Sequence, residues 1–156
     1  MGRNVDRSKR NLLLATSLLV PVLVSRDANA AASETPPIVQ FDERSDAAFI
    51  GRALEMRHRA IASGDQAYGA IVVRDGLIVG QSPSRVVVHR DPTAHAEMEA
   101  IRDAAARLAS RDLSGCTLYS STHACPMCEA AAFWAGIERM VSGQAADDGG
   151  RPGLCA

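Results

Sequence analysis

Two short segments constrain this chain more than any other part of its sequence. One, DPTAHAE, ends at Glu97, and the other, HACPMC, ends at Cys128. The imidazole of His95 and the thiols of Cys125 and Cys128 are three ligands that suit zinc. A structural zinc site usually takes four protein ligands, whereas a catalytic site leaves its fourth position to water. The sequence therefore predicts a catalytic zinc site, with Glu97 beside it to move protons.

Both segments open predicted helices. Apolar residues recur at a helical period over residues 93–108, which would place His95 and Glu97 in the first turn, about 200° apart around the axis. Cys125 and Cys128 are spaced i, i+3, so both sulfurs lie on one face of a helix that opens at Cys125. The proline that follows the first cysteine suits the first helical position. A helix N-terminus also favours the thiolate that zinc needs.

The two segments resemble those of the zinc-dependent nucleobase and nucleoside deaminases of the cytidine deaminase-like superfamily. That family carries His-x-Glu followed by Pro-Cys-x-x-Cys, and its glutamate is not a metal ligand. The DPTAHAE string is most similar to guanine deaminases and bacterial tRNA adenosine deaminases. Over residues 41–143 the resemblance implies a zinc deaminase domain with zinc as cofactor, held by His95, Cys125 and Cys128, and with Glu97 as the catalytic residue. The implied fold is a three-layer α/β/α sandwich with a central mixed sheet.

The resemblance implies hydrolytic deamination of a nucleobase or nucleoside with release of ammonia, and it favours a guanine-type purine. An adenosine- or cytidine-type deaminase is one alternative. A zinc-binding protein of the same fold without activity is another. A thiol–disulfide protein would use the Cys-x-x-Cys sequence alone, but it gives no reason for the DPTAHAE string.

Four residues are predicted to contact the substrate by the same resemblance: Tyr68, Ser84, Ala96 and Trp134. Relatives usually have Phe at the position of Tyr68 and commonly Asn at the position of Ser84. Serine is shorter and cannot offer both an amide donor and a carbonyl acceptor, so this position leaves the identity of the substrate open. Tyr68 and Trp134 are also explained as ordinary core aromatics. Relatives usually have Glu-Pro before the first cysteine, where this chain has His-Ala; we expect His123 to line the pocket rather than to bind the metal.

The remaining pattern predicts the other elements of one domain. Helical spacing with a serine cap predicts a helix over 45–62. Strands are predicted at 67–73 and 77–81, joined by an Asp-Gly hairpin turn, and at 115–121 and 137–142. Residues 144–156 show no apolar period, so we expect a flexible C-terminal tail in place of the family's last strand and helix. Absence of the last strand would expose a sheet edge, and members of the family that the chain resembles are usually dimeric or larger. We therefore expect a homodimer.

The first 30 residues have the composition of an export signal. A basic segment precedes an apolar run over 12–24, and Ala28-Asn29-Ala30 supplies a cleavage site, so 1–30 would be a signal peptide and 31–40 a linker. The run is too short for a stable membrane span, which needs about 20 residues. We therefore expect an exported, periplasmic protein, with Lys9-Arg10 resembling a twin-arginine signal. An uncleaved anchor is the alternative, and the protein would be cytoplasmic if the signal interpretation is wrong.

The charge of the mature chain argues against a nucleic-acid partner. The sequence has 17 basic and 18 acidic residues, of which five basic and two acidic residues lie in 1–30. The rest of the chain therefore has 12 basic and 16 acidic residues, which give a formal charge of −4. A tRNA-binding protein needs a basic face to neutralise phosphates. The expected partner is therefore a small-molecule nucleobase or nucleoside.

Overall fold

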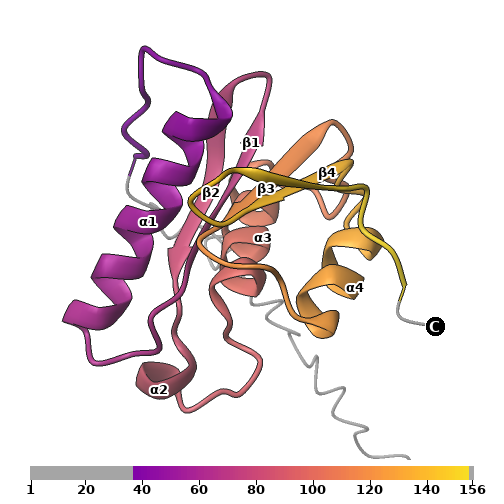
Figure 1. Ribbon diagram of the computed structural model, residues 1–156. Coiled ribbons are helices and arrows are strands. Elements are labelled where there is room, and N and C mark those ends of the chain that lie inside the picture. Colours follow the sequence, from indigo (N-terminus) through magenta and orange to yellow (C-terminus); the bar gives the residue numbers. More distant parts are fainter. Residues whose placement is uncertain (1–36, 155–156) are drawn as a thin grey trace, which may run out of the picture. The chain divides into compact units, whose positions relative to one another are not determined.

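Residues 37–154 are described in the computed structural model of this protein, and they form one mixed sheet with helices on both faces (Figure 1). The five strands lie in the order β2-β1-β3-β4-β5. In chain order the elements are α1 (Asp46–Ala62), β1 (Gly69–Arg74), β2 (Leu77–Pro83), α2 (Val86–His89), α3 (Ala96–Arg107), β3 (Cys116–Ser120), α4 (Pro126–Trp134), β4 (Arg139–Ser142) and β5 (Asp147–Gly150).

The strand pairing combines a hairpin with a parallel crossover. β1 pairs antiparallel with both β2 and β3. Asp75 and Gly76 join β1 to β2 with φ angles of 51° and 73°, which a tight two-residue hairpin turn requires. β3 and β4 are parallel, and α4 supplies the crossover that parallel strands need. The four strands predicted from the sequence are all present, with ends that differ by two residues at most.

Successive residues of a strand point to opposite faces of the sheet, so the strands contribute to two apolar cores. The core under α1 contains Phe49, Ile50, Met56, Ile71, Val73, Ile78, Tyr119 and Val141. The core under α3 and α4 contains Ala70, Val72, Ala96, Ala100, Ala104, Leu113, Cys116, Leu118, Ala132 and Ile137. The predicted three-layer α/β/α sandwich is confirmed.

Two glycines let helix backbone touch strand backbone on the two faces. A Cβ at Gly69 would lie 2.2 Å from the Ala53 carbonyl oxygen and 2.2 Å from the Arg57 nitrogen, both in α1. A Cβ at Gly80 would lie 2.5 Å from the Ala100 carbonyl oxygen in α3. Any larger residue would push the helix away, because such distances are far below a van der Waals contact. These glycines therefore fix α1 and α3 against the sheet.

Local hydrogen bonds set the residues at which α1 and α3 begin. Ser45 caps α1 as predicted, because its Oγ accepts a hydrogen bond from the Ala48 N–H at 3.1 Å. The helix predicted over 93–108 instead begins at Ala96, so the placement of His95 in its first turn is wrong; His95 is the N-cap residue. The cause lies upstream, where the Asp91 carboxylate accepts hydrogen bonds from the N–H and hydroxyl of Thr93, both at 2.8 Å. This Asx turn competes with helix.

The C-terminal segment is more ordered than we expected. Residues 147–150 form β5, which pairs antiparallel with β4 and so covers the edge that a flexible tail would leave open. All four residues of β5 are exposed, and the strand is held by backbone pairing and by an ion pair of 2.8 Å between Arg139 and Asp148. A strand that buries no side chain leaves no apolar period in the sequence. Residues 151–154 form neither a helix nor a strand.

The predicted signal peptide and the first part of the linker lie outside the described residues. Residues 37–40 form neither a helix nor a strand, but Gln40 docks on the outer strand of the sheet. Its side-chain amide donates to the Ile78 carbonyl at 2.9 Å and accepts from the Ile78 N–H at 2.8 Å. Within residues 37–154, every helix is too short or too polar to cross a bilayer.

Candidate active site

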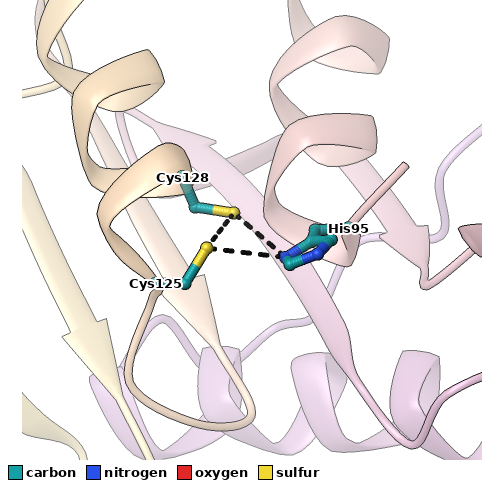
Figure 2. A group of neighbouring side chains, drawn as sticks. All are labelled: His95, Cys125 and Cys128. Carbon is teal, nitrogen blue, oxygen red and sulfur yellow. Dashed lines mark hydrogen bonds between the residues drawn. The ribbon is translucent and has the colours of Figure 1, made fainter. Parts of the chain in front are cut away.

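Three potential metal ligands from two helices meet at one point (Figure 2). The His95 Nδ1 lies 3.6 Å from the Cys125 Sγ and 3.7 Å from the Cys128 Sγ, and the two sulfurs are 3.6 Å apart. Zinc bonds of about 2.3 Å to sulfur and 2.0 Å to nitrogen at tetrahedral angles would separate the sulfurs by about 3.8 Å and nitrogen from sulfur by about 3.5 Å. The triangle therefore fits three corners of a zinc tetrahedron, and the predicted ligands are brought together.

The ends of α3 and α4 create this arrangement. His95 is the N-cap residue of α3 and Cys125 is the N-cap residue of α4, and neither side chain caps its own helix. Both side chains are therefore available to a metal. Pro126 occupies the first turn of α4, as predicted, and Cys128 follows in that turn. The positive ends of two helix dipoles thus face the site, which stabilises thiolate and carboxylate charge there.

The protonation of Cys128 depends on a cation. Its side chain is fully buried, and burial, followed by the neighbouring Glu97 carboxylate, raises its pKa above the ordinary value. A buried thiol of this kind stays protonated unless a metal ion compensates for the charge. The donor set of one imidazole and two thiols, with no fourth protein ligand among the described residues, is that of a catalytic zinc site.

Glu97 lies beside the three ligands but is not one of them. Its Oε2 is 3.7 Å from the Cys128 Sγ, and the residue is only 5% exposed. Burial raises the pKa of the Glu97 carboxyl group. A carboxyl group whose pKa is moved towards neutrality can both accept and return a proton near pH 7, which is what general acid–base catalysis requires.

A pocket of about 510 Å³ opens over these groups and reaches His95, Glu97 and Cys125. Tyr68 and His123 are in its lining, so His123 lines the pocket as expected, whereas the contact of Tyr68 with substrate stays a prediction. Gln66 and Thr122 complete the lining, and sequence reasoning missed both. They lie in loops, just before β1 and just after β3, where no periodicity or motif marks a residue. Adjacency to Tyr68 and to the cysteine segment was the only signal for them.

The other three predicted substrate contacts are placed differently. Ser84 and Ala96 are fully buried, and Trp134 is 71% exposed at the end of α4. None of the three is in the pocket lining, so their contacts with substrate stay predictions.

Ser84 instead belongs to a hydrogen-bonded loop anchor. Its hydroxyl donates to the Asp65 carboxylate at 2.8 Å, and the same carboxylate accepts from the N–H groups of Val87 and Val88, both at 2.9 Å. Burial opposes ionisation of Asp65, but these hydrogen bonds outweigh it and lower its pKa. Asp65 thus ties the segment after β2 to the loop that carries Gln66, a residue of the pocket lining.

Comparison with known proteins supports this description of the site. Residues 43–144 match the family described as the cytidine and deoxycytidylate deaminase zinc-binding region. The chain is 40% identical over 88 residues to guanine deaminase of Bacillus subtilis, covering 56% of this chain and 56% of that protein. It is 40% identical over 93 residues to the tRNA-specific adenosine deaminase of Aquifex aeolicus, covering 60% of this chain and 62% of that protein.

A solved structure agrees with these relatives. The X-ray structure of guanine deaminase from Bacillus subtilis superimposes with a TM-score of 0.60 at 34% identity, covering 67% of this chain and 70% of that one. The chain thus spans about three fifths of the length of the two curated relatives. The family match covers residues 43–144, and the three potential zinc ligands lie within it. This protein therefore belongs to the cytidine and deoxycytidylate deaminase family.

Proposed function

We propose that this protein is a zinc-dependent hydrolase that deaminates a nucleobase or nucleoside and releases ammonia. The observation that carries the proposal is the buried Glu97 carboxyl group beside a three-ligand metal site, with a pocket of about 510 Å³ over both. A pocket of this size is in the range that binds small molecules. A purely structural zinc site would need neither the pocket nor the acid.

His95, Cys125 and Cys128 would hold zinc, which would supply Lewis acidity and make water a nucleophile at neutral pH. Glu97 takes the proton of the attacking water on a carboxylate oxygen and delivers a proton to the departing amino group. Its raised pKa suits both steps, because the same group must be a base and then an acid.

A guanine-type purine is the favoured substrate, which is supported by the similarity to proteins named guanine deaminase. An adenosine-type substrate is the alternative, supported by the similarity to a tRNA-specific adenosine deaminase. The formal charge of −4 outside residues 1–30 argues against tRNA itself as the substrate, since a basic surface is needed for tRNA.

The test is ammonia release by the zinc-loaded full chain from guanine, adenine, cytosine and their nucleosides. We expect about one zinc per chain and turnover of one of these compounds well above the others. Equimolar zinc without any ammonia release would favour a zinc-binding protein of this fold without activity. Absence of zinc, together with a reducible disulfide between Cys125 and Cys128, would favour the thiol–disulfide alternative.

Export and dimerisation extend the proposal. The basic and apolar composition of residues 1–30 supports export to the periplasm, and fractionation of cells producing the full chain tests it. The exposed edge strand β5 and the exposed side chains of Phe133 and Trp134 support a homodimer, which analytical ultracentrifugation tests.

A further inference from the structure

A second hollow of about 480 Å³ adjoins the pocket over the metal site. Gln66, Tyr68 and Thr122 line both hollows, so the two are continuous along these residues. Arg57 and Ala67 complete the lining of the second hollow. A free nucleobase bound beside Glu97 would not contact Arg57, because Arg57 is not in the lining of the first pocket.

Arg57 gives the second hollow a fixed positive charge. Its side chain is half-buried, and its Nε donates a hydrogen bond to the Ala67 carbonyl at 3.1 Å. No residue between 37 and 154 accepts a hydrogen bond from its two terminal nitrogens, and no acidic residue is in the lining. The backbone of Arg57 is also held in place, because α1 lies directly against Gly69.

We propose that this second hollow binds the phosphate of a nucleoside monophosphate whose base occupies the pocket over the metal. A guanidinium group with two free N–H donors on one side forms paired, charge-assisted hydrogen bonds with a phosphate. The Thr122 hydroxyl and the Gln66 amide add neutral donors at the boundary between the hollows. The inference rests on the proposed function for the position of the base.

A mononucleotide fits this surface better than a polynucleotide does. The second hollow contains one arginine, whereas binding to a nucleic acid requires several basic residues along its backbone. Arg85, which could have supplied a second cation, is in the lining of neither hollow.

Calorimetric titration of the zinc-loaded full chain tests the proposal without requiring turnover. The probes are guanosine, adenosine and cytidine, each compared with its 5′-monophosphate. We expect the monophosphate of at least one pair to bind about 10- to 100-fold more tightly than its nucleoside, which is the effect of hydrogen bonds to a charged group. Arg57→Gln should abolish this preference while leaving nucleoside binding unchanged, and Arg57→Lys should retain part of it.

Arg59→Gln is the matched control, since Arg59 is an exposed residue of the same helix and lies outside both linings. It should keep the full preference. The inference is overturned if no monophosphate binds more tightly than its nucleoside, or if the two glutamine variants behave alike. It is also overturned if a tRNA stem-loop shows Arg57-dependent binding while the monophosphates show none.

Ammonia release separates this inference from the proposed function. An Arg57-dependent preference without any deamination would leave the phosphate site standing and reject the proposed reaction. Deamination of a base or nucleoside without a phosphate preference would support the proposed reaction and reject the phosphate site.

Discussion

The two sides of the pocket are built differently. On the metal side, His95, Cys125 and Cys128 are fixed by the first residues of two helices, and Cys128 is fully buried. On the substrate side, Gln66, Tyr68, Thr122 and His123 come from loops or strand ends and are exposed, Tyr68 by 43%. Rigid elements thus hold the groups that need a precise geometry, while loops carry the groups that can vary with the substrate.

This difference predicts that substitutions on the two sides affect activity, substrate affinity and metal content differently. Loss of a residue on the metal side should abolish the reaction for every substrate. Loss of a residue on the substrate side should change the relative affinities and leave the metal in place. The predictions below test this division, beginning with the largest effect.

Cys128→Ala should remove the metal and the activity together. The variant lacks one of three protein ligands, so we expect little bound zinc and a fall in kcat/KM on the order of 10³-fold or more, because several kcal/mol of transition-state stabilisation is lost. Elemental analysis of purified protein and ammonia release measure the two effects. Cys116→Ala is the control, since Cys116 is a buried free cysteine in β3 outside the ligand group. Full zinc content in Cys128→Ala would contradict the proposed ligand set.

Glu97→Gln should separate chemistry from metal binding. The amide keeps the size of the side chain but cannot transfer protons, so kcat should fall by about 10²- to 10⁴-fold at unchanged zinc content. Glu99→Gln is the control: it removes the same charge from the same first turn, where Glu99 pairs with Arg102. Near-normal turnover in Glu97→Gln would remove Glu97 from the mechanism, and loss of zinc would make it a ligand.

The metal side could be predicted from the sequence almost completely. His95, Cys125 and Cys128 belong to short motifs whose spacing is set by helix geometry, and the structure brings all three together. The exact start of α3 could not be predicted, because the Asx turn of Asp91 and Thr93 competes with the helix at a position where the apolar period continues. The structure places His95 at the N-cap and not in the first turn, and its two cysteine partners are the same as predicted.

The substrate side could be predicted only in part. Tyr68 and His123 were identified through the family, but Gln66 and Thr122 depend on loop conformations that local sequence does not encode. The interaction between Ser84 and Asp65 joins residues 19 apart in the chain. β5 was missed because it buries no side chain, and a strand is recognised in sequence by the side chains that it buries.

Ser84→Ala tests whether this residue belongs to the substrate side or to the fold. Removal of the hydroxyl leaves the Asp65 carboxylate with one hydrogen bond fewer, so the free energy of unfolding should fall by about 1–2 kcal/mol. We expect unchanged zinc and a kcat/KM within about threefold of the parent protein, because Ser84 is fully buried outside the pocket lining. Urea unfolding and steady-state kinetics measure the two quantities. A tenfold loss of kcat/KM at unchanged stability would instead support the predicted substrate contact.

Asp46→Asn should have the smallest effect, and only on stability. Asp46 begins α1, the helix that carries Arg57, and its carboxylate joins this helix to the sheet. It accepts hydrogen bonds from Arg139 at 2.7 and 3.0 Å and from the Tyr119 hydroxyl at 2.7 Å. The Arg139 hydrogen bond, followed by that of Tyr119, lowers the Asp46 pKa below its ordinary value of 3.8.

Because the pKa is lower in the folded state than in the unfolded state, the carboxylate stabilises the fold above about pH 3.8, and this contribution is lost as the pH falls towards the folded-state pKa. Asp46→Asn should therefore lower the free energy of unfolding by about 1 kcal/mol at pH 7, a modest value because the pair is partly exposed. The difference from the parent protein should shrink below pH 3.8. The control is Asp42→Asn, which removes the same charge from an exposed aspartate. Urea unfolding of both variants and of the parent protein, at pH 7 and below pH 3.8, measures the difference. A difference that stayed constant with pH would mean that Asp46 acts through packing rather than through its charge.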